Sequence, residues 1–135
     1  DQKIVCAIHS GWLGTVRQIV DHTIRYLIEK ENCNPKEMYC LIGPCLSKKH
    51  LEVQDDVINQ VKKMNFDTSP FYQKTDENHY LLDNKGLNKQ QLLNLGVLEE
   101  NIQVSSYCTN ENNDLFFSHR VNHDGQRNVT IIKRK

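Results

Sequence analysis

The feature that most constrains the fold of this chain is an abrupt change of hydrophobic period near its start. Residues 3–8 form a short apolar run rich in β-branched side chains, which is the pattern of a buried strand. A turn with two glycines follows at residues 9–14, and between Val16 and Ile28 apolar residues recur every three or four positions. That period is typical of a helix with one apolar face. The sequence therefore predicts a strand, a tight turn and a helix that starts near Thr15.

The same alternation of strand-like and helix-like segments continues along the chain. Further strands are predicted at residues 38–42, 51–53, 80–82, 102–107, 115–117 and 129–132. Helices are predicted at residues 55–64 and 84–95, the second closed by Gly96, and residues 65–78 are predicted to form a surface loop. Because strands and helices are interleaved, the predicted fold class is α/β or α+β. A length of 135 residues fits one compact domain.

Charge and cysteine content exclude several classes of protein. Seventeen basic residues balance seventeen acidic ones, so we expect neither nucleic acid nor a membrane surface as a partner. Five cysteines form no zinc-finger or C-x-x-C spacing, which favours a reduced, cytoplasmic protein with free thiols. Cys6 lies in the first apolar run and is expected in the core, and Cys45 is interpreted as a packing residue.

His9 is the first candidate for chemistry. It ends the first predicted strand, and ligands of open α/β sheets bind at the carboxyl ends of strands. Gly11 and Gly14 allow a tight turn close to a ligand, and the amide groups that begin the next helix can face an anion. The alternative is that His9 caps a strand and that Trp12 is a packing residue.

Arg120 is the second candidate, within the segment Ser118-His119-Arg120 that follows an aromatic run. The planar guanidinium of an arginine can hold a phosphate or carboxylate. The alternative is a solvated sheet edge. The other isolated histidines, His22, His50, His79 and His123, lie in polar surroundings and are expected on the surface. The chain contains no G-x-S-x-G elbow and no P-loop, so the usual signatures of serine hydrolases and nucleoside triphosphatases are absent.

Several segments of the chain match, in order, the motifs of one family. They are residues 9–15 (HSGWLGT), 41–46 (LIGPCL), 51–53 (LEV), 82–83 (LD), 91–92 (QL) after Asn88, 96–97 (GV), 108–109 (CT) and 116–120 (FFSHR). On these residues the chain resembles the YfiH-type family, also known as laccase-domain or multicopper polyphenol oxidase proteins, several members of which are assigned as purine nucleoside phosphorylases.

The resemblance implies both a fold and an activity. The fold is a layered αββα sandwich, of which residues 1–135 would be the carboxyl-terminal part, in agreement with a chain that opens on Asp1 rather than methionine. The activity is phosphorolysis of adenosine, inosine or guanosine to the free base and ribose 1-phosphate. Adenosine deamination and cleavage of methylthioadenosine are related reactions. The intact protein is expected to be a monomer, with purine nucleoside and phosphate as its ligands.

The resemblance also assigns roles to single residues. Family members bind one zinc, or copper in the alternative assignment, through two histidines and a cysteine, and His9 matches the last of these ligands. The other two belong to segments that this sequence does not contain, so the 135-residue chain alone is expected to be inactive. Within the same interpretation, His9 is the catalytic and metal-binding residue, Trp12 lines the ribose or base pocket, and Arg120 binds phosphate.

Three other functions remain open at this point. The first is phenol oxidation by copper on the same fold, and the second is a non-catalytic interaction module. The third is a cysteine hydrolase by analogy with deamidating toxins. Leu13, Leu51 and Val121 depart from the family pattern, and Leu13 in particular removes a positive charge next to His9, so we expect weaker phosphate binding.

Overall fold

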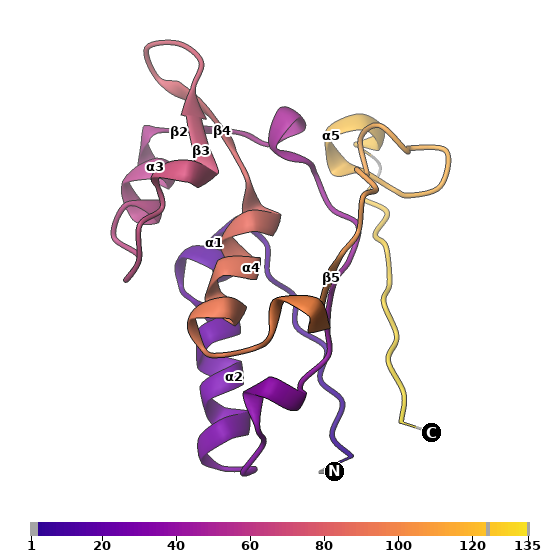
Figure 1. Cartoon of the computed structure of the whole chain (residues 1–135). Coiled ribbons are helices and arrows are strands. Elements are labelled where there is room, and N and C mark those ends of the chain that lie inside the picture. The colour runs from indigo at the N-terminus through magenta and orange to yellow at the C-terminus, as the bar shows by residue number, and fades with distance from the viewer. Residues whose placement is uncertain (1–2, 124, 135) are drawn as a thin grey trace.

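The fold mixes short helices with one parallel and one antiparallel sheet, as predicted (Figure 1). The computed structural model describes residues 3–123 and 125–134. The α-helices are α1 (Trp12–Val16), α2 (Ile19–Glu29), α3 (Asp55–Val61), α4 (Asn84–Asn94) and α5 (His119–Asn122). The strands are β1 (Cys40–Ile42), β2 (Glu52–Gln54), β3 (Tyr72–Lys74), β4 (His79–Leu82) and β5 (Ile102–Val104). Short 3-10 helices are η1 (Pro35–Glu37), η2 (Lys48–His50), η3 (Ser69–Phe71) and η4 (Glu99–Asn101).

The two sheets join segments that are far apart in sequence. Strands β1 and β5 pair in parallel, with Cys40 opposite Ile102. Strand β4 lies between β2 and β3 and pairs antiparallel with both, with Val53 of β2 opposite Tyr80. Residues of β4 alternate between buried and half-buried positions, which is the pattern expected of a strand packed on one face.

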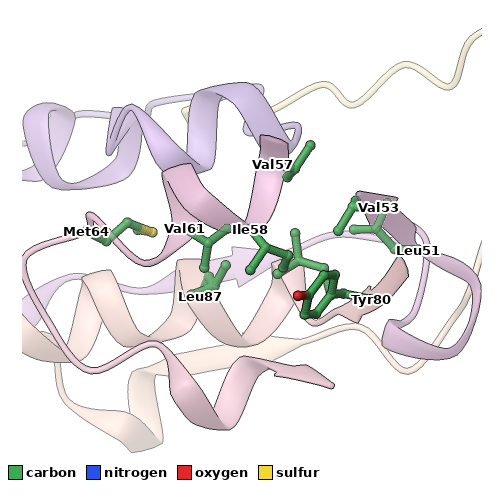
Figure 2. Close-up of a cluster of buried hydrophobic side chains, with 9 residues drawn as sticks. Leu51, Val53, Val57, Ile58, Val61, Met64, Tyr80 and Leu87 are labelled. Atoms are coloured by element: carbon green, nitrogen blue, oxygen red, sulfur yellow. The ribbon is translucent and has the colours of Figure 1, made fainter. Parts of the chain in front are cut away.

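Two hydrophobic clusters stabilise the fold. In the first, side chains of α3, β2, β4 and α4 meet around the fully buried Ile58 (Figure 2). In the second, Val20 and Ile24 of α2 pack with Leu92 of α4 and Ile102 of β5. Helix α4 contributes Leu87 to the first cluster and Leu92 to the second, so it is the element that connects the two halves of the core.

The predicted helix over residues 16–28 is present, but it is divided. Helix α1 begins at Trp12, three residues before the predicted start, and Gln18 then adopts a left-handed conformation with φ of 55°. This residue separates α1 from α2, and both helices contact α4. The amphipathic period predicted the helix correctly, but it contained no signal for the break.

Three predicted strands are wrong. Residues 3–8, 115–117 and 129–132 form no strand, and Val129 is 81% exposed. A strand needs a neighbour that supplies its backbone hydrogen bonds, and within the described residues no segment pairs with these three runs. For the same reason Cys6, expected in the core, is exposed.

The remaining predictions agree with the structure in outline. Gly96 has φ of 87° directly after α4, which is the left-handed cap expected of a glycine there. The predicted loop at residues 65–78 is mostly exposed, although it contains η3 and β3. No helix within the described residues is both long and apolar enough to cross a membrane.

Candidate functional site

The His9 segment forms an ordered turn at which the imidazole is exposed rather than sealed in the core. The ring Nε2 of His9 lies 3.4 Å from the position that a Cβ on Gly11 would occupy. A Cβ on Gly14 would lie 3.3 Å from Ile19 and 3.4 Å from the carbonyl oxygen of His9. A side chain at Gly14 would therefore crowd Ile19, whereas one at Gly11 would make an ordinary contact with the His9 ring.

A closed ring of hydrogen bonds attaches this turn to α4. The Ser10 hydroxyl donates to Oδ1 of Asn88 over 2.7 Å, and Nδ2 of Asn88 donates to the hydroxyl of Thr15 over 2.9 Å. The Thr15 hydroxyl is then left to donate to Ser10 Oγ, 2.9 Å away. Because Thr15 and Asn88 are buried, each of these bonds replaces water that the groups have lost.

Two further amides of α4 hold the same turn. Asn84 donates to the carbonyl oxygen of Ser10 over 2.9 Å. Gln91 donates to the carbonyl oxygen of Thr15 over 3.4 Å and accepts the backbone N–H of Asp21 over 3.2 Å. Residues 84, 88 and 91 share one face of the helix, since residues three and four apart are neighbours on its surface. That polar face holds the backbone that follows His9.

Trp12 lies half-buried against the first hydrophobic cluster. A packing role was the alternative to a substrate contact that the sequence left open for Trp12. Its predicted role in lining a ribose or base pocket stays a prediction.

Arg120 lies on α5 and is exposed, with its Nη2 donating to the carbonyl oxygen of Glu52 over 3.1 Å. Within residues 3–123 and 125–134, no hydrogen bond joins it to His9 or Trp12. The neighbouring His119 stacks edge-on against His123. The three predicted site residues are therefore not gathered into one contact network.

The structure gathers a second group that the sequence did not single out. Nε2 of His50 lies 2.9 Å from Oε1 of Glu111, and these atoms and Sγ of Cys108 all lie within 4.8 Å of one another. His50 was expected to be an isolated surface residue, but it is half-buried. The spacing of 61 residues between His50 and Glu111 gave no sequence signal, because only the fold brings them together.

Electrostatics distinguish the two thiols at this second group. Burial opposes ionisation of Cys108, but hydrogen bonds from Ser47 and from the backbone amides of Glu111 and Asn110 outweigh it and lower the pKa of the thiol to about 7. Burial raises the pKa of the neighbouring Cys45 thiol, in agreement with its interpretation as a packing residue. The hydrogen bond with His50, helped by the charge of Lys49, lowers the pKa of the Glu111 carboxyl.

A metal ion at His9 does not fit the described residues alone. Protein zinc sites use three or four ligands, and within residues 3–123 and 125–134 His9 belongs to no group of three close ligands. The group that does satisfy this criterion in the described part of the chain is His50, Cys108 and Glu111.

Two open hollows lie elsewhere on the surface. One, of about 310 Å³, is lined by Asp21, Arg25, Asn65, Phe66, Gln91 and Asn94. The other, of about 290 Å³, is lined by Leu41, Gly43, Pro44, Gln103, Val104, Ser105, Ser106 and Tyr107. His9, Trp12 and Arg120 line neither of them.

Sequence comparison relates the chain to one family. The sequence model described as "Multi-copper polyphenol oxidoreductase laccase" matches residues 1–135. A curated relative from Bacillus subtilis, named "Purine nucleoside phosphorylase YlmD", is 36% identical over 119 residues, which are 88% of this chain and 43% of the relative. The chain thus spans less than half the length of that relative.

Comparison with solved structures gives the same result for the fold. YfiH from Bacillus licheniformis superposes with a TM-score of 0.80 at 33% identity, covering 83% of this chain and 42% of that protein. YlmD from Geobacillus stearothermophilus superposes with a TM-score of 0.77 at 35% identity, with the same coverage.

Proposed function

Because the chain belongs to the multi-copper polyphenol oxidoreductase laccase family, we propose that it forms part of a purine nucleoside phosphorylase. The observation that carries this proposal is the relative of that name, which is 36% identical over 88% of the chain. In the proposed reaction, phosphate attacks the ribosyl carbon of adenosine, inosine or guanosine. The glycosidic C–N bond breaks, and the products are the free base and ribose 1-phosphate.

The proposal extends to the rest of the protein. The chain spans 43% of the Bacillus subtilis relative, and from the family motifs that it matches we assign residues 1–135 to the carboxyl-terminal part of one longer domain. The missing part would supply the other ligands of a metal to which His9 contributes one imidazole. Family membership suggests a metal, and zinc is our assignment because phosphorolysis needs no redox change.

The described residues support specific roles in that reaction. The exposed His9 sits on a turn held by hydrogen bonds to α4, so the backbone that carries its imidazole is held in place. Arg120 uses one N–H on Glu52, and among the described residues no other acceptor is seen for its guanidinium, whose planar set of N–H groups suits a phosphate oxygen pair. Trp12, half-buried beside His9, offers an aromatic surface for the ribose or base.

Phenol oxidation with copper is the second candidate, because the description of the family model names a polyphenol oxidoreductase. The two candidates differ in their products: ribose 1-phosphate in one case and an oxidised phenol in the other. Adenosine deamination and cleavage of methylthioadenosine are further reactions of the first candidate, and a non-catalytic role would give none of these products.

The test is an assay of the complete protein that carries this chain. With inosine and phosphate we expect ribose 1-phosphate, and with a phenolic dye no oxidation. The His9→Ala variant is expected to lose at least about 100-fold in rate, the loss typical of removing a group that takes part in the reaction.

The matched control is His22→Ala, which removes another exposed imidazole from α2 and should retain the rate. Undiminished ribose 1-phosphate formation in His9→Ala contradicts the role of His9. Dye oxidation without phosphorolysis supports the second candidate.

A further inference from the structure

The His50–Cys108–Glu111 group owes its existence to the parallel pairing of β1 and β5. Parallel strands leave a sheet at the same end, and here the segments after Ile42 and Val104 run on side by side (Figure 1). The pairing resumes between Cys45 and Cys108, where the N–H of Thr109 donates to the carbonyl oxygen of Cys45 over 3.2 Å. The residues that follow Cys45 and those that follow Cys108 are therefore placed next to each other.

Local hydrogen bonds then hold Cys108 and the turn that carries Glu111 in place. Cys108 is 1% exposed, and its sulfur accepts the backbone N–H of Ser47 over 3.3 Å. Asn112 accepts the N–H of Cys108 on its Oδ1 and donates its own N–H to the Cys108 carbonyl, which closes a tight turn that carries Glu111. The sulfur thus forms the floor of the group, and His50 and Glu111 form its outer side.

The donor atoms specify a class of cation. Sulfur, imidazole nitrogen and one carboxylate oxygen suit Zn²⁺ and similar first-row ions, whereas Ca²⁺ and Mg²⁺ require oxygen ligands. Three protein ligands with one open position, filled by water, are a common zinc arrangement. The side chain of Glu111 is 47% exposed, so water can reach that position.

The spacing of the two outer donors, His50 and Glu111, fits such an ion with little movement, and Sγ of Cys108 lies within 4.8 Å of both. With zinc–nitrogen and zinc–oxygen distances of about 2.0 Å, tetrahedral ligands lie about 3.3 Å apart. His50 and Glu111 are now 2.9 Å apart, so they must separate by only a few tenths of an ångström. Lys49 also contacts the Glu111 carboxylate, at 3.5 Å, but its side chain is 77% exposed and can move into solvent.

From this geometry we propose that His50, Cys108 and Glu111 form a metal site for Zn²⁺ or a similar ion, separate from His9. The competing interpretation is an ordinary charge cluster of Glu111, His50 and Lys49 lying above a core cysteine. The two interpretations predict different behaviour toward metal ions, whether or not the proposed phosphorylase activity is real.

The first measurement is metal uptake by the 135-residue chain. Equilibrium dialysis against Zn²⁺ followed by metal analysis should give one ion per chain. Replacement by Co²⁺ should produce a thiolate-to-cobalt charge-transfer band in the near ultraviolet, together with the intense visible bands of a four-coordinate ion.

Variants identify the ligands. Glu111→Gln and His50→Gln each remove one ligand and are expected to weaken zinc affinity more than about 100-fold, beyond the usual loss for a residue that only supports a ligand. Cys108→Ser should abolish the charge-transfer band. Because Cys108 is buried and its loss can disturb folding, the exposed Glu111 provides the independent test, with circular dichroism as the check on folding.

Two controls are matched to these changes. Cys45→Ser removes the neighbouring half-buried thiol, and His9→Ala removes the imidazole of the other candidate site; both should keep stoichiometric uptake and the cobalt band. The proposal is overturned if zinc uptake is below stoichiometric level, or if Glu111→Gln and His50→Gln both bind zinc as tightly as the parent chain. Loss of the band in Cys45→Ser but not in Cys108→Ser overturns it as well.

Discussion

Asn88 is the single side chain on which the His9 turn most depends. Its amide bonds Ser10, Thr15 and the carbonyl oxygen of Asn84, and no water can replace these bonds at a buried position. Loss of the amide leaves buried donors and acceptors without partners, which costs more than the bonds themselves contribute.

We therefore expect Asn88→Ala to lower the free energy of unfolding by about 1–3 kcal/mol. Chemical denaturation of both proteins measures the difference. Gln90→Ala is the matched control, because Gln90 bonds Asn94 on the exposed side of the same helix, and its effect should stay below about 0.5 kcal/mol. If both variants lost the same free energy of unfolding, a stabilising role for the hydrogen bonds among Ser10, Thr15 and Asn88 would be contradicted.

The cysteines show how far single residues were predictable. Cys6 lies in an apolar run and was expected to be buried, yet it is exposed. Cys108, in a polar segment, is buried. Local hydrophobicity describes what a residue prefers, but burial depends on whether another part of the chain covers it.

The buried side of helix α4 carries both leucines and amides. Leu87 and Leu92 enter the two hydrophobic clusters, while Asn84, Asn88 and Gln91 bind the turn that carries His9. One helix thus connects the core to the candidate site, so a change at the carboxyl-terminal end of α4 should affect both.

The carboxyl-terminal cap of α4 depends on Gly96. At φ of 87° a side chain is strained, and this conformation costs a non-glycine residue about 1–2 kcal/mol. We expect Gly96→Ala to reduce the free energy of unfolding by about 1 kcal/mol, measured by chemical denaturation.

Gly43→Ala is the matched control for this change. Gly43 does not have positive φ, and a Cβ there meets no atom within 4 Å. Its effect should be below about 0.5 kcal/mol. A Gly96→Ala variant as stable as the parent chain would contradict the strain attributed to this cap.

Among the elements, the helices and the middle strands were the predictable part. Helices form most of their backbone hydrogen bonds within one segment, so the local sequence of residues 84–95 with its closing Gly96 was enough to predict α4. The strand-like runs at residues 3–8 and 129–132 needed partners that the described chain does not supply.

Considered as a whole, the molecule exposes an unusual amount of apolar surface. Leu41 of β1 is 66% exposed and Val104 of β5 is 37% exposed, although parallel strands are normally covered on both faces. Ile131 and Ile132 are exposed as well. A two-stranded parallel sheet also leaves strand edges free to pair with another chain.

From this exposure we expect the 135-residue chain to self-associate at raised concentration. Sedimentation velocity should show species larger than the monomer, and the double variant Leu41→Lys/Val104→Lys should shift them back toward monomer, because charges oppose pairing of exposed strands.

The control is Lys62→Glu/Lys63→Glu, which changes two exposed residues after α3 and leaves the β1–β5 sheet intact. A parent chain that stays monomeric at every concentration contradicts the expectation. If the control variant dissociated as much as Leu41→Lys/Val104→Lys, the chain would associate through a surface other than the β1–β5 sheet.

Sequence alone determined the fold class, the family and the His9 turn, because periodic segments and contiguous motifs express their information locally. The tertiary structure decided which apolar runs are covered, that α4 holds the turn through Asn88, and that His50 meets Cys108 and Glu111. The meeting of His50 with Cys108 and Glu111 follows the register in which β1 and β5 pair, and a pairing between residues about sixty positions apart leaves no periodic trace in the chain.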